Sequence, residues 1–149
     1  MVELVIAVSI FTGSIVVMGN ILSLQLTLAI KNEDRIQAVF LAEEVFEALR
    51  FLRTEDWTNI DGLANSVSYV LNESAGSWSI TTSGSGQPLP GYYRVFHLGA
   101  VNRDANDDIT ASGGTLDTDI RSVTATVSWY TSQGTSTYSV YGYVTNLFK

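Results

Sequence analysis

The 149-residue chain contains no cysteine, a single histidine and two prolines. Without cysteine it can form no disulfide, no thiolate zinc site and no cysteine nucleophile. The one histidine, His97, falls within an expected strand, where a lone histidine is more often packed or exposed than catalytic. The sequence has no glycine-rich phosphate-binding loop, no nucleophile-elbow motif and no histidine pair for a metal. We therefore expect a protein that is not an enzyme.

Basic residues are also few. Eight lysines and arginines stand against fifteen aspartates and glutamates, which gives a formal net charge of −7. Proteins that bind nucleic acids neutralise phosphates with lysine and arginine, so this charge predicts no nucleic-acid partner. An acidic surface rich in serine and threonine suits a solvent-exposed exterior.

Charged residues are missing altogether from residues 4–30, which follow Glu3 directly. The hydrocarbon core of a bilayer is roughly 30 Å thick and is crossed by ~20 apolar residues in a helix, so this segment is long enough to span it. Nothing basic precedes the segment, and it continues directly into a charged helical pattern. This arrangement indicates a retained segment rather than a secretory signal.

The apolar segment differs from a helix that stays only in lipid, because polar side chains and glycines dilute it. These are Ser9, Thr12, Gly13, Ser14, Gly19, Asn20, Ser23, Gln25 and Thr27. Each glycine weakens a helix by ~1 kcal/mol. Such dilution is useful to a helix that must also leave the membrane and pack against copies of itself.

Residues 31–53 continue the helix with an amphipathic pattern. One arc, wide enough to cover a sheet, carries the apolar side chains Ala38, Leu41, Ala42, Val45, Ala48, Leu49 and Leu52. Ile36, Phe40 and Phe51 lie among the polar residues of the remaining surface. Isolated surface hydrophobic residues are common, but a helix that is buried on one face only has no use for these three. We interpret them as a second contact stripe for neighbouring molecules.

The rest of the chain alternates between strand patterns and loops. We expect strands at 92–101, 120–131 and 135–146, two short strands or a short helix and a strand at 63–71 and 77–82, and loops at 83–91 and 102–119. The clearest pattern places Val123, Ala125, Val127 and Trp129 on one face of the strand at 120–131. A turn then leads to a return strand with Tyr138, Val140 and Val144 on one face, which predicts a hairpin with one buried side. Together these patterns predict an α+β fold.

Three stretches carry a resemblance to a known family. They are MVELVIAVSIF at the start, FLAEEVFEALRFLRTEDW (40–57) and the C-terminal VTATVSWYTSQGTSTYSVYGYVTNLF (123–148). They resemble mature type IV pilins and pseudopilins, in particular the modification or assembly-type pilins close to the minor pseudopilins of type II secretion. The motif at the start is fairly specific, because a glutamate at the head of an exported apolar helix is costly and otherwise rare.

Two features depart from this family. Its members usually begin with an N-methylated aromatic residue four positions before the glutamate. Here only Met1 and Val2 precede Glu3, which leaves open whether two residues are missing. Many members also have a disulfide, which this chain cannot form.

The resemblance implies a long N-terminal α-helix whose apolar first half protrudes and whose second half packs on a C-terminal antiparallel β-sheet. It divides the chain into a membrane-spanning and filament-core helix, residues 1–30, and a globular pilin domain, residues 31–149. The implied function is that of a structural subunit of a type IV pilus-like filament. Its partners are copies of itself, the inner-membrane assembly machinery and, before assembly, the membrane. The expected location is an extracellular filament at the cell surface, supplied from a membrane-inserted precursor pool.

Two alternatives remain open at this point. Within the family, the chain is a minor pilin or a type II secretion pseudopilin. Outside it, the chain is a membrane-anchored binding or enzymatic domain.

Glu3 is the residue that we expect to direct assembly. A lone carboxylate in apolar surroundings costs several kcal/mol unless it is paired or neutralised. In this family its partner is the terminal amine of an adjacent subunit. The alternative is a carboxylate that rests at the membrane interface.

An acidic loop is the one candidate for a metal site, and we expect no other cofactor. Asp104, Asn106 and Asp108 place oxygen-bearing side chains at alternate positions, and Asp117 and Asp119 follow. Calcium favours roughly six to eight oxygens at such loop spacing. The loop is not an EF-hand, because other residues occupy the positions of the EF-hand glycine and final glutamate. An ordinary acidic turn is therefore the alternative to a calcium site.

Overall fold

The structure, a computed structural model of the whole chain, describes residues 1–146. Within them the elements are α1 (Val2–Glu55), α2 (Thr58–Asp61), β1 (Val70–Ser74), β2 (Ser77–Thr81), β3 (Tyr92–Arg103), β4 (Ile109–Thr110), β5 (Thr115–Thr131) and β6 (Gly134–Thr145). A long N-terminal helix followed by antiparallel sheets confirms the α+β class expected from the sequence. Residues 147 and 148, at the end of the C-terminal resemblance, lie outside the described residues.

The described residues form two compact units, Met1–Ile36 and the part of the chain from Gln37 onward. The predicted boundary after residue 30 marks the end of the uncharged segment and stays a prediction. The first unit is helical from Val2 onward, and all of residues 1–33 are exposed. Its helix passes through both glycines of the apolar segment without a break.

Four hydroxyl groups in this first unit are satisfied within the helix. Each donates a hydrogen bond to the carbonyl oxygen four residues earlier, at 2.7–3.0 Å; the donors are Ser9, Thr12, Ser14 and Thr27. Because these groups need no outside partner, they can enter an apolar environment without the cost of an unmade hydrogen bond.

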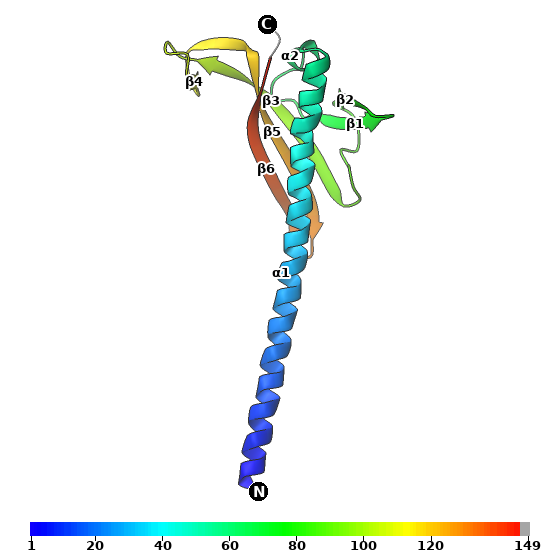
Figure 1. Cartoon of the computed structure of the whole chain (residues 1–149), viewed down its shortest axis with the longest axis vertical. Coiled ribbons are helices and arrows are strands. Elements are labelled where there is room, and N and C mark those ends of the chain that lie inside the picture. Colours follow the sequence, from blue (N-terminus) through cyan, green and yellow to red (C-terminus); the bar gives the residue numbers. More distant parts are fainter. Residues whose placement is uncertain (147–149) are drawn as a thin grey trace. The chain divides into compact units, whose positions relative to one another are not determined.

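In the second unit, the C-terminal part of α1 packs on one face of the larger sheet (Figure 1). The helix residues buried there are Ala38, Leu41, Ala42, Val45, Ala48, Leu49 and Leu52. They are the residues predicted to form the sheet-facing arc, so that prediction is confirmed. Phe40 and Phe51 are exposed, as expected for residues outside the arc.

The larger sheet has four strands in the order β4-β3-β5-β6, and β1 and β2 form a separate two-stranded sheet; every pairing is antiparallel (Figure 1). The predicted inward side chains of β5 are all buried. On β6, Val144 is buried while Tyr138 and Val140 are half-buried on the same face. The hairpin with one buried side is therefore confirmed, with its turn between Thr131 and Gly134.

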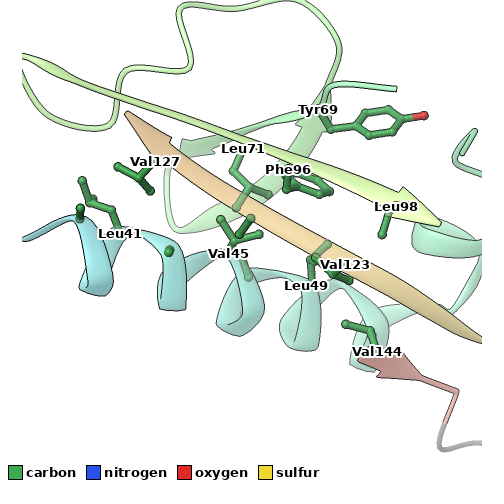
Figure 2. Close-up of a cluster of buried hydrophobic side chains, with 14 of the residues drawn as sticks. Leu41, Val45, Leu49, Tyr69, Leu71, Phe96, Leu98, Val123, Val127 and Val144 are labelled. Carbon is green, nitrogen blue, oxygen red and sulfur yellow. The ribbon is translucent and has the colours of Figure 1, made fainter. Parts of the chain in front are cut away.

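The hydrophobic core lies between α1 and the inner face of β3 and β5 (Figure 2). Val45 and Leu49 of the helix, Phe96 of β3, and Val123 and Val127 of β5 are completely buried. Full burial of each such side chain stabilises the fold by about 1.5–3 kcal/mol. Burial of this kind, rather than a disulfide, holds the second unit together.

Arg121 is a buried arginine on β5 that no pattern in the sequence singles out. Its Nη1 donates to the carbonyl oxygen of Asp61 at 2.8 Å, and its Nη2 donates to the carbonyl oxygen of Leu63 at 2.8 Å and to Asn65 Oδ1 at 2.7 Å. The segment between α2 and β1 is thus fixed to the sheet by one guanidinium group.

We expect Arg121→Met to lower the free energy of unfolding by about 2–3 kcal/mol, because it removes three hydrogen bonds that a buried guanidinium donates to the segment before β1. The measurement is urea unfolding of the full chain in a mild detergent. The matched control is Arg50→Met, which removes an exposed ion pair to Glu47 and should change stability by about 0.5 kcal/mol or less. Equal effects of the two substitutions would show that Arg121 contributes no more than a surface arginine.

The loop expected at 102–119 is partly wrong. β3 continues to Arg103, β4 forms at Ile109–Thr110, and β5 begins at Thr115. Aspartate and asparagine are depleted in strands, so propensity predicts a loop here. The side chain of Arg103 instead donates from Nε to Asp117 Oδ2 at 2.6 Å, which links β3 and β5 across the sheet.

The strand or helix expected at 63–71 begins only at Val70, after an isolated bridge between Tyr69 and Phe96. Arg121 is the reason, because it binds backbone and side-chain oxygens of the segment before β1. Ser66 also has a left-handed backbone conformation, with φ of 60°. The strand expected at 77–82 is confirmed as β2.

Candidate assembly surfaces

Glu3 lies in the first turn of α1 and is exposed. A carboxylate at this position interacts favourably with the partial positive charge of the helix N-terminus. Among the described residues it has no ion pair and no hydrogen bond. Glu3 is therefore available to a cation from outside the chain.

Every large apolar side chain in residues 4–30 is at least 50% exposed. By its length and composition, the helix that carries them can cross a membrane. Soluble proteins rarely leave an apolar surface of this extent uncovered, and where they do it marks contact with a membrane or a protein.

Asn20 and Gln25 differ from the four residues of the same segment whose hydroxyls are bonded within the helix. Neither carboxamide has a hydrogen bond to any described residue. In apolar surroundings such groups form hydrogen bonds across helices. These two residues are therefore candidates for contacts with neighbouring helices.

A groove of about 680 Å³ lies along the second unit, between α1 and β6. Its lining residues are Phe40, Glu43, Glu44, Phe46, Glu47, Arg50, Val140, Tyr141, Gly142 and Tyr143. Gly142 is needed for close approach, because a Cβ at this position would lie 2.8 Å from Phe46 Cε1. Phe40 is 65% exposed at the groove. One residue of the predicted contact stripe therefore lines a surface that α1 and β6 form together.

Two tyrosines of β6 add further apolar surface to this groove. Tyr141 and Tyr143 are exposed, and their rings meet edge to face with centroids 5.2 Å apart. A hydrogen bond with Tyr141 raises the pKa of Tyr143 above the usual tyrosine range. Sequence reasoning missed this pair, although the alternation of β6 already placed both residues opposite the buried side of the strand.

The acidic loop of the calcium prediction forms a turn between β3 and β4. Asp104 Oδ1 accepts hydrogen bonds from the backbone amides of Asn106 at 2.8 Å and Asp108 at 3.0 Å. Arg103 pairs with Asp117, and this hydrogen bond raises the pKa of the guanidinium, so a permanent cation sits beside the loop.

Among residues 1–146, no group of three or more His, Cys, Asp or Glu side chains is arranged to hold a metal ion. Asp104 already closes the turn, and Asp119 lies beyond it on β5. Calcium binding at this loop stays a prediction without further geometric support.

His97 of β3 has a partner that the sequence did not reveal. Its Nε2 lies 2.8 Å from the hydroxyl of Ser68, in the segment before β1. A hydrolytic serine also needs a third group that orients the imidazole. Within the described chain, no carboxylate is bonded to His97, so the pair carries no proposal of catalysis.

Comparison of the chain with protein-family models, with curated proteins and with solved structures finds no match.

Proposed function

We propose that this chain is a structural subunit of a type IV pilus-like extracellular filament. The observation that carries the proposal is the apolar part of α1, in which every large side chain is exposed and no charge occurs over residues 4–30. All of residues 1–33 are exposed, and the helix that carries them is long and apolar enough to cross a membrane. A membrane covers it before assembly, and the same segments of neighbouring copies cover it afterwards.

The composition of the segment supports this dual role. Four of its five hydroxyls are bonded within the helix, which suits lipid, while Asn20 and Gln25 keep free carboxamides for neighbouring helices. Apolar burial stabilises association by ~25 cal/mol per Å². Summed over many copies, this term produces a strong fibre without enzymatic chemistry.

Glu3 supplies direction to an otherwise non-directional contact. When a subunit enters the base of the fibre, its terminal amine is placed among apolar helices, where the Glu3 carboxylate of a neighbour is the nearest opposite charge. Electrostatic attraction is strong in such surroundings, because the local dielectric is low. We propose that this pair sets the axial register of neighbouring subunits. Apolar packing alone would allow one helix to slip along another.

The proposed location, an extracellular filament supplied from the membrane, follows from this mode of assembly. The membrane holds a pool of precursors by their apolar helices, an assembly motor moves them into the polymer, and the acidic second unit faces the exterior. The alternatives are a minor pilin or secretion pseudopilin at a filament tip, and a membrane-anchored binding or enzymatic domain. They differ from the proposal in one measurable respect, because none of them makes up the bulk of a filament.

The test is to shear filaments from cells that express the chain and to identify their repeating subunit by mass spectrometry. We expect this chain as the main component, and the intact mass also reports an N-terminal methyl group. If the chain occurs only in the membrane fraction, or as a trace component of a fibre made of another protein, the proposal is wrong.

The assembled helix should not be regular throughout. Gly13, Ser14, Gly19 and Asn20 are poor helix formers within eight residues of one another. The single chain is helical through them, but in a fibre neighbouring helices compete for their backbone and side-chain groups. We expect a stretched or unwound segment within residues 12–22 in a filament reconstruction. An unbroken α-helix there would show that glycine alone does not open the helix.

A further inference from the structure

The groove between α1 and β6 has features that are typical of a binding surface. Phe40, Tyr141 and Tyr143 leave 65%, 59% and 41% of their surface exposed around it. β6 is the edge strand of the larger sheet, and no charged residue or proline protects its 12 residues. Uncharged edges of this kind are normally covered or blunted.

The carboxylates of the groove indicate which chemical groups can bind there. Glu44 is paired with Arg94, and Glu47 is paired with Arg50. Glu43 is exposed and has no ion pair or hydrogen bond to a described residue. An aromatic groove with one unpaired carboxylate fits a guanidinium group that is followed by an apolar side chain, because arginine both pairs with carboxylates and stacks on aromatic rings.

Within the described part of the chain, one arginine is both unpaired and followed by an apolar residue. Among residues 1–146, Arg35 is the one lysine or arginine without an ion pair or hydrogen bond; the others are Lys31, Arg50, Arg53, Arg94, Arg103 and Arg121. Ile36 follows it directly and is 55% exposed. In a protein of net charge −7, a cation that meets an unpaired carboxylate reduces the electrostatic repulsion between copies.

We propose that the groove of one copy binds the Arg35–Ile36 segment of a second copy, with the guanidinium on Glu43 and the isoleucine against Phe40. The two surfaces are different patches of the same chain, so each copy can bind one neighbour with its groove and another with its arginine. Contacts of this heterologous kind build open-ended helical polymers where the rotation between copies does not close into a ring. The inference rests on the proposed filament and names the surfaces through which its outer layer is held together.

Charge reversal tests the pairing. Arg35→Glu and Glu43→Arg should each lower sheared-filament yield about tenfold or more, because each brings like charges together at a contact. The double variant, Arg35→Glu with Glu43→Arg, should recover most of the wild-type yield. The matched control is Glu73→Arg, at an exposed carboxylate outside this groove, which should leave the yield unchanged. Wild-type yield from either single variant, or no recovery in the double variant, would overturn the inference while leaving the filament proposal intact.

Cysteine cross-linking tests the contact even if no filament is found. Since the chain has no cysteine, Arg35→Cys with Glu43→Cys introduces the only thiols. Mild oxidation of whole cells should give a ladder of covalent oligomers, whereas Arg35→Cys with Glu73→Cys should give dimers at most. A ladder in membranes of cells without filaments would support the contact but contradict the proposed function. Absence of the ladder from the first pair would overturn the contact.

Discussion

Replacing Glu3 by alanine should lower the yield of sheared filaments about tenfold or more, with the amount of protein in the membrane unchanged. In the fibre the terminal amine of each copy would face apolar helices without a partner, and an unpaired charge there costs several kcal/mol. About 1.4 kcal/mol already corresponds to a tenfold change in an equilibrium constant. Membrane insertion should persist, because residues 4–30 keep their full apolar surface.

Two further variants separate charge from other effects of the Glu3 substitution. Glu3→Gln keeps the size and part of the hydrogen bonding but removes the charge, and we expect it to resemble Glu3→Ala. Glu33→Ala removes an exposed carboxylate later in the same helix and should assemble normally. The measurement is sheared-filament yield beside membrane abundance. Normal yield from Glu3→Ala would reduce Glu3 to a carboxylate that rests at the membrane interface.

Removal of residues 1–30 should convert the protein into a soluble, folded monomer. All of residues 1–33 are exposed, and every buried side chain of α1 lies at or after Ala38. The truncated chain therefore loses the apolar surface that needs a membrane and none of the core. Trp129, which is 8% exposed and stacks on Tyr92, should keep its near-UV circular dichroism signal.

Size-exclusion chromatography and near-UV spectra give the result. A matched control removes residues 1–45, which also takes away four helix residues of the core, and this shorter chain should fail to fold. Aggregation of the 31–149 chain, or loss of its near-UV signal, would mean that the apolar helix contributes to the stability of the sheet-bearing part.

Residues that repeat with a regular period were the ones that sequence analysis placed correctly. The seven-residue arc of α1 and the alternation of β5 were both found because burial on one face leaves a periodic trace in the sequence. Arg121 left no such trace, since its acceptors are two backbone oxygens and one side-chain oxygen that lie about sixty residues earlier in the chain. The polar start of β5 was missed because strand propensity is set by neighbours, here the pair between Arg103 and Asp117.

The candidate surfaces were likewise predictable only where they leave a local pattern in the sequence. Glu3 stood out because a single carboxylate precedes an uncharged segment, and the sequence alone shows that contrast. The groove was not predictable, because α1 and β6 contribute to it from distant parts of the chain. The identity of Arg35 as an unpaired cation likewise emerged only once the partners of the other described arginines were known.

In the proposed filament, apolar helices of many copies form the core of the fibre, and Glu3 is paired inside it. Electron cryomicroscopy of the sheared filaments, at a resolution that shows side chains, tests this most directly. We predict that residues 4–30 of neighbouring copies pack together along the fibre axis, with each Glu3 carboxylate within ion-pair distance of the terminal amine of an adjacent subunit. A fibre whose core excludes these helices, or one in which Glu3 points to solvent, would show that the proposed packing is wrong.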